Sequence, residues 1–280
     1  MRSNLVSIKT TSGLVARDHI IVPQIRGSVG PMTHTVKDAA IMLSIMAGPT
    51  DDDPLSMKIP FETIPEYENS CKKDALDGSR LAIPRNALLN PIAKDMNIAP
   101  VLDLFDDVIG LLINAGATVI DQANYTAYDE VNARDAPQGI AGPAEWKHGM
   151  TSYFRELEVN PRNLQTMEDL ISCTKEMPEE EYPSRDVSSW DSVKDAEDIE
   201  SPRVAEALER MKYLGGPGGI DGVLDHANAD AIIYPSICSS DVPGLVGYPV
   251  ICVPLGFMPK DTPVKTNPRG NLVEDGPGIP

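Results

Sequence analysis

The feature that most constrains the fold of this chain is a strand–helix–strand rhythm between residues 80 and 120. Residues 80–84 (RLAIP) form a short apolar run closed by proline, which is typical of a strand. Residues 97–115 carry apolar side chains at helical spacing, and residues 118–120 (TVI) form the next apolar run. The sequence therefore predicts an α/β fold with a mixed, mostly parallel central sheet flanked by helices.

Several other segments predict regular structure. Residues 36–46 form a helical pattern that Thr35 can cap, with Asp38 at the third helical position and Gly48 after its end. Short apolar runs bounded by glycine or proline predict further strands. They lie at residues 5–8, 14–16, 20–22, 231–235 and 249–254.

The chain is interpreted as a single domain over residues 1–280 with two atypical segments. Residues 127–212 combine helical patterns with many charged residues, and we expect a helical acidic insert there. Residues 260–280 are rich in proline and glycine, and we expect a loop-rich tail.

Charge and cysteine usage limit the partners and the compartment. The formal net charge is -18, which opposes binding to nucleic acid and to anionic membranes. No run approaches 18 apolar residues, and residues 1–7 contain no apolar signal segment. The four cysteines have no CxxC spacing and indicate free, mostly buried thiols. We therefore expect a cytoplasmic protein without a membrane span.

Lone candidate residues do not assemble into a catalytic or metal-binding motif. The four histidines lack metal-ligand spacing, so we expect no metal and no cofactor. Lys9 is interpreted as a structural lysine, and residues 215–219 (GGPGG) as a helix end with a turn. The serines that stand out lie neither in a G-x-S-x-G motif nor beside a recognisable base. They are Ser28, Ser236, Ser239 and Ser240.

The order and spacing of several motifs resemble the amidase signature family, most closely its fungal members. Residues 8–15 (IKTTSGLV) stand where the family has a G-[IL]-K-P-T-x-G-L stretch. Residues 30–32 (GPM) and 36–40 (VKDAA) match its next segment, and residues 247–257 (GYPVICVPLGF) resemble its final region. The resemblance implies a partial amidase-signature fold and kinship with enzymes that hydrolyse carboxamide C–N bonds.

The resemblance also implies where chemistry is missing. Family members use a serine nucleophile, a bridging serine and a lysine base, all upstream of the block at Lys9. We therefore expect a fragment without the N-terminal catalytic segment and the extreme C-terminal segment, with no catalytic residue of its own. Ser239, Ser240 and Tyr248 fall where the family lines its substrate pocket and form the candidate pocket wall. Gly27 and His34 are departures, since the family has Asp and Arg there.

Three functional interpretations stay open. The chain is an amidase-like protein that acts on a small-molecule amide only when completed, a non-catalytic scaffold that keeps the pocket wall, or a product of gene decay or a gene-model error. A sheet without its neighbours also predicts self-association through exposed edges. The residues expected to be poorly covered are Val250, Ile251, Val253 and Leu255.

Overall fold

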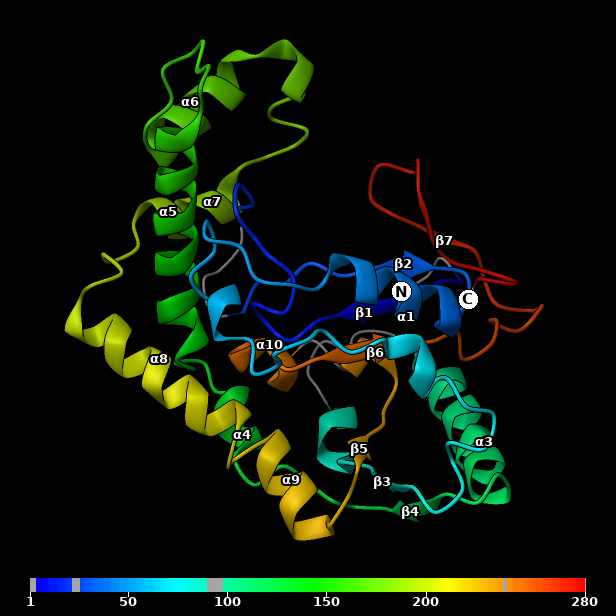
Figure 1. Ribbon diagram of the computed structural model, residues 1–280. Helices are drawn as coiled ribbons and strands as arrows, with labels where there is room; N and C mark the ends of the chain where they lie inside the picture. The colour runs from blue at the N-terminus through cyan, green and yellow to red at the C-terminus, as the bar shows by residue number, and fades with distance from the viewer. Residues whose placement is uncertain (1–3, 22–25, 90–97, 239–240, 280) are drawn as a thin grey trace.

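A computed structural model describes residues 4–21, 26–89, 98–238 and 241–279. One of its sheets joins the two ends of the described chain (Figure 1). Strand β1 (Val6–Lys9) lies between β2 (Met32–Thr33) and β6 (Val250–Cys252) and pairs with both in the antiparallel sense. Residues far apart in sequence, such as Ser7 and Cys252, thereby become direct neighbours.

The second sheet contains the parallel pairing that the strand–helix–strand rhythm predicted. Strand β3 (Arg80–Ala82) lies between β4 (Thr118–Ile120) and β5 (Ala231–Ile232), and both pairs are parallel. The predicted α/β class is confirmed. Among the described residues, this parallel sheet and the antiparallel sheet around β1 are separate, each with three strands.

Two predicted helices flank these sheets. Helix α1 (Val36–Met46) has the predicted bounds, and the Thr35 side chain accepts a hydrogen bond from the Asp38 backbone N–H at 3.1 Å. Helix α3 (Ala99–Asn114) connects β3 to β4 in sequence. The spacing of their apolar residues and the glycines after each helix account for both elements.

Residues 127–212 contain helices and no strand. The longest, α5 (Gln138–Glu156), extends away from the sheets together with the shorter helices that follow it (Figure 1). The other helices of this part are α4 (Tyr128–Val131), α6 (Met167–Glu176), α7 (Ser188–Lys194) and α8 (Pro202–Gly215). Helices α9 (Ile220–Ala227) and α10 (Val242–Val246) follow, and the glycine-rich residues 215–219 link α8 to α9.

The main apolar core lies between the parallel sheet and helices α4, α8, α9 and α10. On α8, Val204, Met211 and Leu214 are at most 1% exposed. Met211 and Leu214 belong to one cluster with Tyr128 of α4 and Val242 of α10. Burying these side chains stabilises the position of α10, after which the candidate pocket-wall residue Tyr248 follows.

Two predicted N-terminal strands are not formed by the described residues. Residues 14–15 form bends and residues 16 and 20–21 are irregular, while Val22 of the second predicted strand lies outside the described residues. The tail, expected to be rich in loops, contains one short antiparallel pair, β7 (Lys265–Thr266) with β8 (Val273–Asp275). Asn267 donates its backbone N–H to the Leu272 carbonyl and Gly270 takes a positive φ of 71°, so the turn residues close a hairpin.

The cysteines and the helices can be compared with the expectations of free thiols and of no membrane span. All four cysteines are free, as predicted, but only Cys238 is buried and Cys71 is exposed. Within the described ranges, no helix is both long enough and apolar enough to cross a membrane.

Candidate functional site

Tyr248 lies where the two ends of the described chain meet. Gly247 ends α10 with a φ of 76°, a conformation that favours glycine, and Tyr248 follows half-buried before β6. The backbone N–H of Ser12 donates to the Gly247 carbonyl at 3.1 Å, and Lys9 Nζ donates to the Tyr248 carbonyl at 2.9 Å. Strand β1 and the turn after it therefore fix the Tyr248 backbone. Ser239 and Ser240, the other predicted pocket-wall residues, lie outside the described residues.

The Tyr248 hydroxyl faces acidic side chains of α9. Burial raises the pKa of Tyr248 well above its ordinary range, and a hydrogen bond to the Asp221 carboxylate and the charge of Asp225 raise it further. The phenol is therefore neutral at physiological pH and can donate a hydrogen bond.

Further hydroxyl groups surround the residues that flank positions 239 and 240. The Tyr128 hydroxyl lies 3.4 Å from the Asp241 carboxylate, and the Tyr125 hydroxyl lies 3.4 Å from that of Tyr234. Burial raises the pKa values of Tyr128 and Tyr234 to about 12, and that of the Cys238 thiol to about 11. These groups stay protonated, so the surroundings of this segment are polar but largely uncharged, apart from Asp241.

Lys9 is the residue whose side chain contacts the Tyr248 backbone. Burial lowers the pKa of Lys9 to about 8, because the charged amine loses hydration and its bonded partner is a neutral carbonyl. This geometry agrees with a structural role for Lys9.

The lowered pKa makes the reactivity of Lys9 pH-dependent near neutrality. We expect the rate of Lys9 acylation by an acetic anhydride pulse to rise with a midpoint near pH 8. Peptide mass spectrometry across pH 6 to 11 measures this midpoint. The same protein in concentrated urea serves as the control, where the midpoint should return to about 10.4. A native midpoint at or above pH 10 contradicts the lowered pKa.

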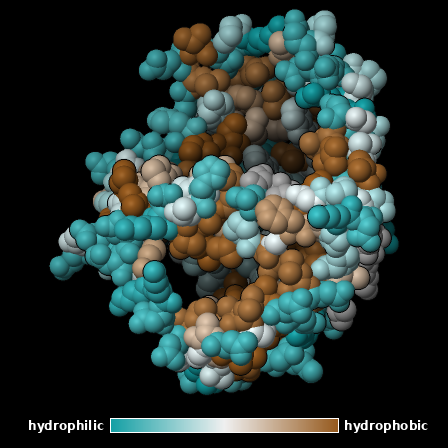
Figure 2. All heavy atoms as spheres, turned by 90° about the vertical axis from the view of Figure 1, so that its right-hand side faces the viewer, coloured by the Kyte–Doolittle hydropathy of each residue, from teal (hydrophilic) through white to brown (hydrophobic). Residues whose placement is uncertain are grey.

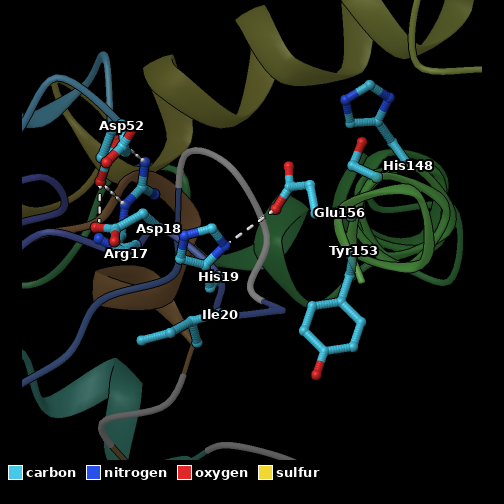
Figure 3. A pocket seen from close by; sticks show the side chains of 11 residues that line it. Arg17, Asp18, His19, Ile20, Asp52, His148, Tyr153 and Glu156 are labelled. Carbon is cyan, nitrogen blue, oxygen red and sulfur yellow. Dashed lines mark hydrogen bonds and ion pairs between the residues drawn. The ribbon is translucent and has the colours of Figure 1, made fainter. Parts of the chain in front are cut away.

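A separate cavity lies between the N-terminal loops and α5. Its volume is about 330 Å³, and His19 and Glu156 face each other across it with 3.5 Å between Nδ1 and Oε2 (Figure 3). Its lining is largely polar, and four of its eleven residues are acidic. It consists of Arg17, Asp18, His19, Ile20, Asp52, Asp53, His148, Gly149, Ser152, Tyr153 and Glu156.

Sequence reasoning missed this cavity, although part of its signal was available. His148, Ser152 and Glu156 recur every four residues and therefore share one face of α5. The opposite wall comes from loops at residues 17–20 and 52–53, whose proximity to α5 has no sequence signature.

Two buried ion pairs hold these loops in place. Arg17 and Asp53 bond through two nitrogens, at 2.9 and 3.0 Å, and their side chains are 9% and 6% exposed. Arg26 bonds to Glu145 of α5 at 2.9 Å, and the Glu145 side chain is 1% exposed. Gly142 makes room for Arg26, because a Cβ there would lie 3.0 Å from the guanidinium.

The remaining candidate residues differ in burial and in hydrogen bonding. The Ser28 hydroxyl oxygen is buried without a hydrogen-bond partner, and Ser236 is exposed. The buried Gly27 offers its carbonyl to Arg17 at 3.4 Å, whereas His34 is exposed on the approach to α1. Within the described part of the chain, no three His, Cys, Asp or Glu side chains converge as a metal site.

Comparison with known proteins identifies relatives along the whole chain. A protein of Arthroderma benhamiae described as an amidase is 34% identical over 281 residues, which cover 100% of this chain and 46% of the relative. The peptide amidase from Stenotrophomonas maltophilia superposes with a TM-score of 0.76 at 25% identity, over 92% of this chain and 53% of its own. An amidase family protein from Bacillus anthracis shares the fold, with a TM-score of 0.72 at 18% identity, over 97% of this chain and 49% of its own.

These matches confirm the resemblance seen in the motifs. The chain spans about half the length of the relatives that it matches. The amidase family model matches residues 2–212, which is most of the chain. Together with the α/β fold, these similarities show that the chain belongs to the amidase family.

Proposed function

We propose that this chain contributes the substrate-pocket wall of an enzyme that hydrolyses a small-molecule carboxamide. The observation that carries the proposal is the meeting of two family-like segments, residues 8–15 and 247–257. They are 239 residues apart at Lys9 and Tyr248, yet they are hydrogen-bonded side by side. The hydroxyls of Ser239 and Ser240 would be neutral donors to the carbonyl of an uncharged amide, which costs no buried charge. The Tyr248 hydroxyl, whose proton goes to the Asp221 carboxylate, would accept a hydrogen bond from the amide N–H.

We further propose that the chain alone does not hydrolyse amides. A serine hydroxyl needs a base to become nucleophilic, and Lys9 donates to a backbone carbonyl instead. The buried Ser28 hydroxyl has no hydrogen-bond partner among the described residues, so none of these acts as its base. Ser239, Ser240 and Tyr248 would then bind and orient the amide, while nucleophile and base come from a further segment.

The test is a comparison of the chain alone with a completed protein. We expect the purified chain to show no amide turnover and no stoichiometric serine labelling by a fluorophosphonate. Co-expression with the part of the Arthroderma benhamiae protein that aligns with no residue of this chain should produce both. Turnover by the chain alone that one Ser→Ala change abolishes would contradict the proposal.

A second arm of this experiment carries Gly27→Asp with His34→Arg. The new carboxylate at position 27 would lie near Arg17, which already binds the carbonyl of residue 27. Activity in this arm only would mark the pair as a structural requirement. A folded complex without activity in both arms would favour a non-catalytic scaffold.

We also propose that the protein works in the cytoplasm. The four free thiols support this assignment, because oxidising compartments favour disulfides. Cell fractionation in the presence of a thiol-trapping reagent would test this location. Disulfide-linked protein in freshly lysed cells would contradict it.

A further inference from the structure

Helix α3 exposes far more apolar surface than a solvated helix does. Phe105 is its one fully buried side chain among the described residues, and Leu111 is 65% exposed. An amphipathic helix normally turns its apolar stripe toward the core and polar residues toward solvent, so large apolar residues exposed on α3 call for a covering surface. Its large apolar residues are Val101, Leu102, Leu104, Phe105, Val108, Ile109, Leu111, Leu112 and Ile113.

The segment that follows β6 packs against α3. Gly256 lies against Leu104, since a Cβ there would come within 2.6 Å of the leucine side chain. Leu111 lies two helical turns beyond Leu104 on the same side of α3. In the neighbouring segment, Ile251, Val253 and Phe257 are 53%, 55% and 60% exposed. The α3–β6 face is defined here as Leu111, Ile251, Val253 and Phe257.

The prediction of poor coverage in this segment was therefore right for two of its four residues. Ile251 and Val253 are exposed, while Val250 and Leu255 are half-buried. Figure 2, which views the molecule from the side on which α3 lies, shows apolar side chains gathered over a hollowed surface. Exposed apolar side chains gathered on one side of a molecule mark an interaction site.

The total surface of the chain is also too large for a compact monomer. The chain exposes 16507 Å². A compact monomer of 30.3 kDa exposes about 11,800 Å². The excess of roughly 4,700 Å² on this one chain is larger than one partner's share of a standard interface, about 800 Å², and the protruding insert accounts for part of it.

We propose that the α3–β6 face binds a polypeptide equivalent to the part of the amidase relatives that this chain does not span. The proposal rests on the proposed function and names its partner. This chain covers 53% of the peptide amidase from Stenotrophomonas maltophilia with a TM-score of 0.76. The remainder of that protein has to pack against the equivalent half, and apolar helix and strand surfaces are what layered α/β folds bury.

Charge favours this occupant over a second copy of the chain. Two copies would bring net charges of -18 together. Next to the face, α3 carries Asp103, Asp106 and Asp107 on its exposed surface. A partner with an apolar centre and a Lys- and Arg-rich rim complements this arrangement, whereas a second acidic copy does not.

Binding is tested by sedimentation velocity and hydrogen exchange with the unaligned part of the Arthroderma benhamiae protein as the probe. We expect a 1:1 complex and new amide protection in α3 and residues 250–257. Leu111→Glu and Ile251→Glu should each weaken the complex at least tenfold. Val159→Glu is the matched control, because Val159 is 76% exposed on the insert and lies outside the face.

Each outcome decides the assignment. Circular dichroism and thermal melting first establish that the variants fold like the parent. Equal binding by all variants, or no complex with a folded chain, overturns the proposal. Self-association at high salt that Leu111→Glu and Ile251→Glu abolish assigns the face to a second copy instead. Binding is measured without substrate, so a complex without turnover refutes the proposed function and leaves this inference intact.

Discussion

Replacing Gly30 by alanine will disrupt the β1–β2 pairing and lower the free energy of unfolding by about 3 kcal/mol or more. A Cβ on Gly30 would lie 1.8 Å from the Ile8 carbonyl oxygen, which no rotamer change can relieve. The strands would have to separate. That movement removes the hydrogen bond from the Ile8 N–H to the Pro31 carbonyl and the one from the Thr10 hydroxyl to the Val29 carbonyl.

The matched control is the same substitution in α3. Nothing lies within 4 Å of a Cβ on Gly110, which is in the helix interior. Gly110→Ala should stabilise the protein by about 0.5 to 1 kcal/mol, since alanine is the better helix former. Urea unfolding followed by circular dichroism measures both variants. A Gly30→Ala protein as stable as its parent would show that the close approach of Gly30 to Ile8 is wrong.

Replacing Arg17 by methionine should cost about 3 kcal/mol at pH 7, because it leaves a buried carboxylate without its cation. Asp53 accepts hydrogen bonds from Arg17 Nε, Nη2 and backbone N–H, and from the Leu55 N–H. Methionine keeps the length of the side chain, so lost packing contributes little. Arg85 provides the control, because its ion pairs with Asp106 and Asp121 are exposed to solvent. Arg85→Met should lower the free energy of unfolding by less than about 1 kcal/mol.

The loss of stability caused by Arg17→Met should be smaller at acidic pH than at pH 7. The hydrogen bond from Arg17 holds the pKa of Asp53 below its usual value in the folded state. A depressed carboxyl pKa contributes stability that is fully present above the unfolded pKa, near 4, and is lost as the pH falls through the folded pKa. The difference between parent and variant should therefore shrink below pH 4. A difference that stays constant from pH 7 to pH 3 would rule out this electrostatic account.

Local sequence signals predicted the elements with strong periodicity. Helix α1 was predicted with its cap, because Thr35 and Asp38 act within one turn of each other. Helix α3 was predicted within two residues at either end, and β3 and β4 were predicted as neighbours along the same rhythm. The family resemblance was correct because several short motifs recur in order along the chain.

Contacts between distant segments could not be predicted in this way. The pairing of Arg26 with Glu145 depends on a loop meeting the side of α5, and charged residues in loops and helices carry no periodic signal for their partners. The cavity beside α5 depends on the same meeting. The tail hairpin was not predicted because strands of two and three residues have too little apolar alternation to distinguish them from loop.

The pairing of β1 with β6 has a consequence for biosynthesis. Ser7 emerges from the ribosome 245 residues before its partner Cys252, a delay of roughly 12 to 50 s at ordinary elongation rates. Strand β2, by contrast, follows β1 within about 25 residues and can pair early. Throughout the interval one edge of β1 presents free backbone donors and acceptors to the nascent chain. Codons that slow translation between α5 and α9 should therefore lengthen dependence on chaperones more than codons that slow translation before α1.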